Sequence, residues 1–232
     1  MVPAGVDGVH LHVEVRGHGP PLLLILGLGA DVSEYASTID GLARSWQVIA
    51  FDNRGAGRSD KPDEPYSIEL MAADTAGLLA AFEHPRVTVL GISLGGRIAM
   101  ELALRCPDRI ERLILVSTSA RVNPKRRRRW LWPILSGLPI LRSQHPQPRY
   151  AFKRQMAAST GWDATPRLHQ LSMPTAIMHG RRDRTAPLAL AEEMHAAIPG
   201  STLRVFRGGH LFFLLRDRRR FLEAVAEFVG RT

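Results

Sequence analysis

The segment from Val87 to Met100 constrains the fold more than any other part of the chain. It reads Val-Thr-Val-Leu-Gly-Ile-Ser-Leu-Gly-Gly-Arg-Ile-Ala-Met, so β-formers run into a Gly-x-Ser-x-Gly pattern and a helix-forming sequence follows at once. A strand, a tight turn and a helix in this order would hold Ser93 at the apex of the turn. Side chains at Gly91 and Gly95 would collide with the neighbouring strand and helix, which is why glycine is needed there. The exposed Ser93 hydroxyl would be placed to attack a carbonyl group.

Strands alternate with helices along most of the chain. An alternating segment at 9–15 predicts an antiparallel edge strand with one wet face. Apolar or β-branched runs predict further strands at 22–26, 47–51, 112–117, 175–178 and 203–206, and helical spacing predicts helices from Ser67, at 188–198 and from about 218 to 229. This alternation implies right-handed crossovers and a mostly parallel, doubly wound α/β sheet.

The regular alternation stops between residues 121 and 170. This segment holds six prolines, and it carries eleven of the 31 basic residues of the chain but one of the 22 acidic residues. The basic excess therefore belongs to this segment, and the rest of the chain is close to neutral. We predict one α/β core, residues 1–120 and 171–232, with a short, basic, proline-rich cap insertion at 121–170. A chain of 232 residues with 45% hydrophobic residues can bury such a core.

The N-terminal sequence and the cysteine content bear on the compartment. No basic region followed by an apolar region opens the chain, and the longest early apolar run, 22–26, is too short for a signal peptide or a membrane span. A single cysteine, Cys106, excludes an internal disulfide. We therefore expect a soluble, cytoplasmic protein.

A nucleophilic Ser93 needs a base to accept its proton and an acid to orient that base. In a parallel sheet these groups are expected on loops at the carboxyl ends of strands. The strand at 175–178 runs into a loop that contains Asp183, and the strand at 203–206 runs into Arg-Gly-Gly-His, which offers His210. The chain order is then Ser, Asp, His.

The combined motifs resemble the α/β-hydrolase fold family over nearly the whole chain. The resemblance rests on the elbow Gly91-Ile92-Ser93-Leu94-Gly95, the Asp-x-Arg-Gly-x-Gly-x-Ser turn at 52–59, the His-Gly-x-x-Asp loop at 179–183 and Gly209-His210. It implies a Ser93–His210–Asp183 triad. It also implies an oxyanion hole formed by the backbone N–H of Leu94 and that of Leu28, which lies on the loop after the third strand.

The sequence is most similar to the esterase and enol-lactonase-like branch of this family, and it departs from that branch in two ways. Many members carry His-Gly where this chain has Leu26-Gly27, so any hydrogen bond made by that histidine is absent. The insertion at 121–170 is shorter than the usual helical cap, which implies a more open or differently roofed pocket. We assign to the substrate pocket Gly27, Gly29, Trp130, Trp132 and Leu211.

Other candidate residues fit less well. An aspartate at the elbow would indicate a dehalogenase or an epoxide hydrolase, but the residue is Ser93. Only His210 combines a strand-end loop with the required order, and His179 is better suited to shaping its own loop. No Cys/His/Asp cluster has metal-ligand spacing, and no glycine loop ends in the Lys-Ser/Thr of a phosphate cradle, so we predict no metal and no cofactor.

The basic run 125–129 and the apolar residues near it bear on partners. The run fits a solvated cap helix whose tryptophans roof the pocket, or a patch for an anionic lipid surface or an acidic carrier protein. Nucleic acid is not expected, because no aromatic-basic interleaving accompanies the charge. Trp130, Trp132, Phe212 and Phe213 would form an apolar rim that a second subunit could cover, so a homo-oligomer is possible.

The resulting hypothesis is a serine hydrolase that acts on a small-molecule ester, lactone or thioester. Ser93 would attack the carbonyl, His210 would act as base and then as acid, and water would cleave the acyl-enzyme. Two alternatives stay open. The same triad could serve a biosynthetic thioesterase, cyclase or acyltransferase, or the chain could be a non-hydrolytic ligand-binding protein on this fold.

Overall fold

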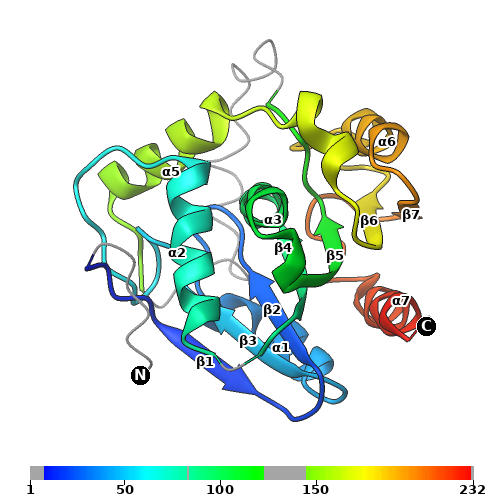
Figure 1. The fold of residues 1–232 in the computed structure, drawn as a ribbon, viewed down its shortest axis with the longest axis horizontal. Helices are drawn as coiled ribbons and strands as arrows, with labels where there is room; N and C mark the ends of the chain where they lie inside the picture. The colour runs from blue at the N-terminus through cyan, green and yellow to red at the C-terminus, as the bar shows by residue number, and fades with distance from the viewer. Residues whose placement is uncertain (1–7, 83, 123–144, 231–232) are drawn as a thin grey trace.

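The computed structural model describes residues 8–82, 84–122 and 145–230, which form a seven-stranded sheet with the order β1-β3-β2-β4-β5-β6-β7 (Figure 1). The edge strand β1 pairs antiparallel with β3, and all other pairings are parallel. The strands are β1 Val13–Arg16, β2 Pro21–Ile25, β3 Gln47–Phe51, β4 Val87–Ile92, β5 Ile110–Val116, β6 Thr175–Gly180 and β7 Thr202–Phe206. The mostly parallel sheet and its antiparallel edge are as predicted.

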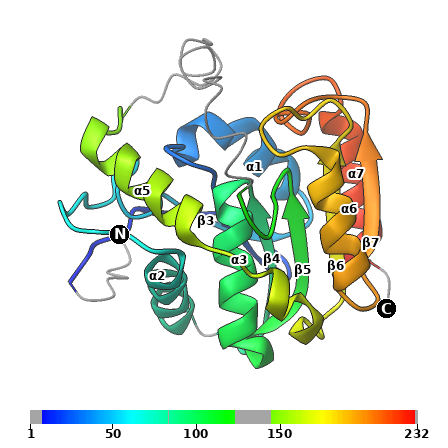
Figure 2. The ribbon, with the colours of Figure 1, turned by 90° about the horizontal axis from the view of Figure 1, so that it is seen from above.

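Helices cover both faces of this sheet (Figures 1 and 2). The helices are α1 Ala36–Leu42, α2 Ile68–Ala80, α3 Leu94–Arg105, α5 Arg149–Gly161, α6 Leu188–Ala197 and α7 Arg218–Val229, with short 3-10 helices at Val32–Tyr35, Pro107–Arg109 and Thr165–Gln170. Alternate residues of β2 serve the two faces: Leu23 and Ile25 pack in the cluster that includes α2, α3 and α6, and Leu22 and Leu24 pack with α1 and α7. The continuous apolar run of this strand is explained by burial on both sides.

The sequence analysis does not predict two of the helices, α1 and α5. The chain turns into α1 through a 3-10 turn whose cap, Asp31, accepts hydrogen bonds from the backbone N–H of Ser33 and of Glu34. In the predicted cap insertion, α5 has one side of small or polar buried residues, among them Ala151 and Gln155, so no apolar stripe marks it.

Within the described ranges, no helix is long and apolar enough to cross a membrane.

Phe212 and Phe213 do not form the predicted apolar rim. Their exposed fractions are 2% and 0%, and their rings pack with those of Phe206 and Phe221 between the sheet and α7. Consecutive aromatic residues after the histidine loop complete the core on this face, so the prediction that a second subunit covers them is wrong. Trp130 and Trp132, the other members of that rim, lie outside the described residues.

The closest backbone approach in the core lies where α3 crosses β2. A Cβ built on Gly95 would lie 2.1 Å from the backbone oxygen of Ile25, and neither backbone can yield without moving a central strand or helix. By contrast, a Cβ on Gly161, the last residue of α5, would meet nothing within 4 Å.

Gly95→Ala should therefore destabilise the fold by about 3 kcal/mol or more, or prevent folding, because the added methyl group overpacks a rigid site. Gly161→Ala should be neutral or stabilising by up to about 1 kcal/mol, since it only restricts the unfolded chain. Urea unfolding of both variants measures the difference. Equal free energies of unfolding in the two variants would contradict the assigned packing.

Candidate active site

Ser93 sits in a backbone conformation that the surrounding structure enforces. It joins β4 to α3 with φ 55° and ψ −113°, in the positive-φ region that side chains rarely adopt. Its N–H donates to the carbonyl oxygen of Val116 at 2.9 Å, and its own carbonyl accepts from the Thr118 hydroxyl at 2.6 Å. These bonds to the end of β5 hold the strained turn, as expected for a functional elbow.

The structure brings Ser93, His210 and Asp183 into one hydrogen-bonded series. His210 Nδ1 lies 2.7 Å from Asp183 Oδ2, and His210 Nε2 lies 3.0 Å from Ser93 Oγ. Because the carboxylate can only accept, Nδ1 carries the proton and Nε2 is left to accept from the serine hydroxyl. The Asp183 side chain is fully buried and that of His210 is 14% exposed, so the series opens to solvent from its histidine and serine end.

The acid loop after β6 holds Asp183 in place. Oδ1 of Asp183 accepts the N–H groups of Thr185 and Ala186, both at 2.8 Å, which leaves Oδ2 for the histidine. The buried His179 donates through Nε2 to the Ala186 carbonyl at 2.7 Å. Burial, opposed by this bond and by the Asp183 charge, lowers the pKa of His179, so this imidazole is neutral at pH 7. His179 stabilises the acid loop, and it is His210 that forms the hydrogen bond to Ser93.

The histidine loop lies against the acid loop through close backbone contacts. A Cβ on Gly180 would lie 2.3 Å from the Gly209 carbonyl oxygen, so glycine is required at this crossing. The Arg182 N–H donates to the Gly208 carbonyl at 3.0 Å, and the Ser117 hydroxyl donates to the His210 carbonyl at 2.8 Å. Three strand ends, those of β5, β6 and β7, therefore fix the position of the imidazole.

The predicted oxyanion donors lie on two adjacent strand ends. Leu94 follows Ser93 directly, and Leu28 lies just beyond Ile25, which pairs with Gly91 in the parallel register of β2 and β4. The loop that carries Leu28 follows β2, the second strand of the described chain and not the third as expected. Among the described residues, neither N–H has a hydrogen-bond acceptor, so both are available to a ligand.

Gln155 of α5 is a residue of this site that sequence reasoning missed. Its amide oxygen accepts the Gly29 N–H at 3.0 Å, and its amide nitrogen donates to the Arg54 carbonyl at 2.7 Å. The side chain is fully buried. Asn53 secures the same loop from the other end by donating to the Leu26 carbonyl at 2.9 Å. A glutamine among basic and small residues carries no sequence signal, so only the fold could reveal it.

The predicted pocket residues divide by location. A Cβ built on Gly27 would lie 3.6 Å from Ser93 Cβ and 3.6 Å from the Tyr35 hydroxyl, so Gly27 lies against the serine. Gly29 has φ +70°, and a Cβ there would approach Gln147 Oε1 to 2.8 Å. Leu211 is partly buried and directly follows His210. Trp130, Trp132 and the basic run 125–129 lie outside the described residues, and the described part of the chain contains no cluster suited to a metal.

Three carboxyl groups, those of Asp31, Glu34 and Asp52, lie together next to the loop that carries Leu28. Asp52 accepts from the Val32 N–H at 2.7 Å and from the Arg58 N–H at 2.8 Å, and Glu34 accepts from the Asp31 N–H at 3.3 Å. Burial and the charges of Asp31 and Asp52 raise the pKa of Glu34 to about 7. Burial also raises the pKa of Asp52, against the effect of its two backbone hydrogen bonds. Burial and mutual repulsion therefore both oppose ionisation of these carboxyl groups.

Comparison with known proteins places the chain in a family. A family model described as the alpha/beta hydrolase fold matches residues 20–157, which is more than half of the chain. The chain therefore belongs to the α/β-hydrolase fold family, and it resembles hydrolases of known sequence and structure. A poly(3-hydroxyalkanoate) depolymerase from Ectopseudomonas oleovorans is 30% identical over 92% of this chain and 84% of its own length.

Solved structures support the same placement along the whole chain. A hydrolase from Pseudomonas aeruginosa PA01 superposes with a TM-score of 0.88 at 28% identity, covering 98% of this chain and 97% of its own. The enol-lactonase from Burkholderia xenovorans LB400 gives a TM-score of 0.84 at 25% identity over 97% and 98%. An esterase from Exiguobacterium antarcticum gives 0.83 at 26% identity over 97% of each chain. The resemblance to an esterase and enol-lactonase-like branch is confirmed.

Replacing Glu34 with Gln should stabilise the protein at pH 8 and leave it unchanged near pH 4. The pKa of this carboxyl rises from 4.5 to about 7 on folding, so its contribution to stability is fully present below 4.5 and is lost as the pH rises through about 7. The neutral amide avoids that loss, which is on the order of 1–3 kcal/mol at pH 8. Thermal unfolding across this pH range measures it. Glu192→Gln, at an exposed position on α6, controls for net charge, and an equal gain there would contradict the prediction.

Proposed function

We propose that this protein is a serine hydrolase that cleaves a carboxylic ester, lactone or thioester of a small molecule through an acyl-enzyme. The observation that carries the proposal is the series in which Asp183 Oδ2 lies 2.7 Å from His210 Nδ1 and His210 Nε2 lies 3.0 Å from Ser93 Oγ. These distances and this tautomer are those that general-base activation of a serine needs.

The proposed steps follow from the roles of the groups. Ser93 Oγ attacks the carbonyl carbon while His210 Nε2 accepts the hydroxyl proton, and Asp183 stabilises the imidazolium that results. The N–H groups of Leu28 and Leu94 donate to the oxygen that becomes negative. His210 then gives its proton to the departing alcohol or thiol. A water molecule, deprotonated by the same imidazole, releases the acid from Ser93 and restores the hydroxyl.

The names of the similar proteins support this substrate class. They include a depolymerase, an enol-lactonase and an esterase, and the last two act on carboxylic esters by their names. In an ester or lactone, the carbonyl oxygen would accept from the N–H groups of Leu28 and Leu94, and the alkoxy oxygen would be the leaving group. Hydrolysis of such a substrate therefore gives a role to each of the three side chains and to both backbone N–H groups.

Ser93→Ala should lower kcat/KM for p-nitrophenyl esters by roughly 10⁴-fold or more and leave the unfolding temperature near that of the wild type, because only the nucleophile is lost. Esters of increasing acyl length measure turnover and the size of the pocket together. Ser45→Ala, at an exposed serine between α1 and β3, should retain full activity and serves as the matched control.

Three outcomes bear directly on the proposal. Full activity of Ser93→Ala would contradict it. Absence of both turnover and labelling by a fluorophosphonate in the wild type would favour a ligand-binding protein. Labelling together with burst kinetics on an acyl thioester, and transfer of the acyl group to an added alcohol or amine, would assign the same triad to acyl transfer or cyclisation.

Gln155→Met should lower kcat by about 10- to 100-fold with little change in KM for a short ester. The substitution keeps the side-chain volume but removes both hydrogen bonds of Gln155, one from the Gly29 N–H and one to the Arg54 carbonyl, so the neighbouring Leu28 N–H loses its alignment in the transition state. Affinity for a trifluoromethyl ketone, which mimics the oxyanion, should fall by the same factor as kcat/KM. Gln170→Met, at an exposed position, is the control. A lower unfolding temperature without a change in kcat would reduce Gln155 to a structural role.

A further inference from the structure

The start of α7 breaks the usual charge rule for helices. Its first turn consists of Arg218, Arg219 and Arg220 and contains no acidic residue, and the side chain of the N-cap residue Asp217 makes no capping hydrogen bond. The N-terminus of a helix carries partial positive charge, so cations there cost free energy. Such local violations are expected where a ligand compensates them.

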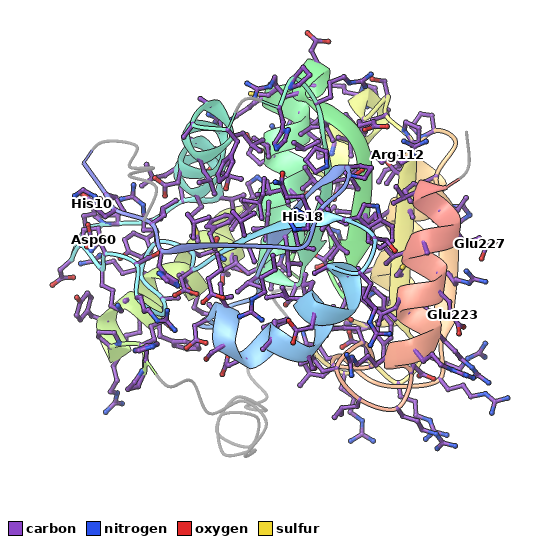
Figure 3. All side chains as sticks on the ribbon, turned by 90° about the horizontal axis from the view of Figure 1, so that it is seen from below. His10, His18, Asp60, Arg112, Glu223 and Glu227 are labelled. Carbon is purple, nitrogen blue, oxygen red and sulfur yellow. The ribbon has the colours of Figure 1, made fainter. Side chains whose placement is uncertain are left out.

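Two of these arginines, Arg219 and Arg220, border a cavity. The cavity has a volume of about 190 Å³ and is lined by Arg207, Arg216, Arg219, Arg220 and Asp217. This is roughly six times the share of one water molecule in the liquid, enough for a phosphate or pyrophosphate group with some of its water. Figure 3 shows nitrogen-tipped side chains gathered around one end of α7, while Glu223 and Glu227 lie farther along the helix.

The cavity has an unbalanced positive charge. Asp217, its one carboxylate, is 4% exposed and accepts the Gly208 N–H at 2.9 Å. Within the described residues, Arg207, Arg216 and Arg220 have no ion pair, and Arg219 only approaches the exposed Glu223 at 3.6 Å. Arg218 points elsewhere and donates to the Ser37 carbonyl.

The neighbouring loop adds more charge of the same sign. Arg181, Arg182 and Arg184 are exposed on the acid loop, whose Arg182 N–H bonds to the Gly208 carbonyl beside the cavity. Eight arginines, Arg218 included, thus lie on two touching loops and the first turn of α7, at the sheet edge that also carries Ser93 and His210. Repulsion among them lowers stability unless an anion is bound.

We propose that this cavity binds the phosphate or pyrophosphate group of a small molecule. Guanidinium groups present paired N–H donors that match phosphate oxygens in a bidentate way, and the partial positive charge at the start of α7 adds to their attraction for an anion. A compact cavity with several guanidinium groups suits one such group better than the repeating backbone of a nucleic acid. The site is independent of the proposed hydrolysis, because binding needs neither Ser93 nor His210.

Calorimetric titration of the full chain with pyrophosphate tests this site. The double variant Arg219→Gln/Arg220→Gln should bind about tenfold more weakly or worse, because each lost charge-assisted contact is worth about a factor of ten. Arg44→Gln, at an exposed arginine between α1 and β3 with no partner among the described residues, should bind like the wild type. Ser93→Ala should also bind normally, which separates this test from that of the proposed function.

Thermal unfolding supplies a second measurement that does not depend on the affinity being high. Without pyrophosphate the double variant should unfold at the same or a higher temperature than the wild type, because it relieves repulsion at the helix start. With pyrophosphate the wild type should gain stability and the double variant should not. The proposal is overturned if 10 mM pyrophosphate binds to neither protein, if the Arg44→Gln and double variants lose equal affinity, or if the arginines bind only vesicles of anionic lipid.

Discussion

The backbone at Ser93 is the constraint on which the rest of the structure depends. The turn holds a positive φ of 55° through hydrogen bonds to Val116 and Thr118, and α3 packs so closely on β2 that a Cβ on Gly95 would lie 2.1 Å from the Ile25 carbonyl oxygen. Strain of this kind persists where the surroundings over-determine the conformation. The parallel register of β2 and β4, with Ile25 opposite Gly91, also places the loop of Leu28 beside the turn of Ser93 and Leu94, the two residues proposed as oxyanion donors being Leu28 and Leu94.

The loops of the candidate site are hydrogen-bonded to one another. Ser117 at the end of β5 bonds to the His210 carbonyl, and the backbone of Arg182 bonds to Gly208. Gln155 reaches from α5 to the Gly29 N–H, so a helix of the 121–170 segment stiffens a loop more than a hundred residues earlier. The proposed oxyanion donors would need to hold their positions during the reaction, and these hydrogen bonds restrict the movement of the loops that carry them.

Sequence reasoning succeeded where local pattern and tertiary demand agree. The apolar run of β2, the Gly-x-Ser-x-Gly turn and the cap at Ser67 each follow from residues within a few positions, and their outcome matched. It failed where burial comes from distant segments. Phe212 follows a loop and was expected at the surface, yet it packs against Phe206 and Phe221. The role of Gln155 follows from its hydrogen bonds to Gly29 and Arg54, which are distant in the sequence.

The distribution of charge in space could not be predicted from the sequence either. Outside residues 121–170 the basic and acidic residues nearly cancel, which suggests an electrically neutral body. The fold separates these charges in space: acids such as Asp31, Glu34 and Asp52 gather behind the oxyanion loop, while Arg207 and the first turn of α7 gather beside the histidine loop. Each gathering opposes folding through like-charge repulsion. The fold therefore concentrates like charges at the sheet edge that carries Ser93, beside the proposed active site and the proposed anion site.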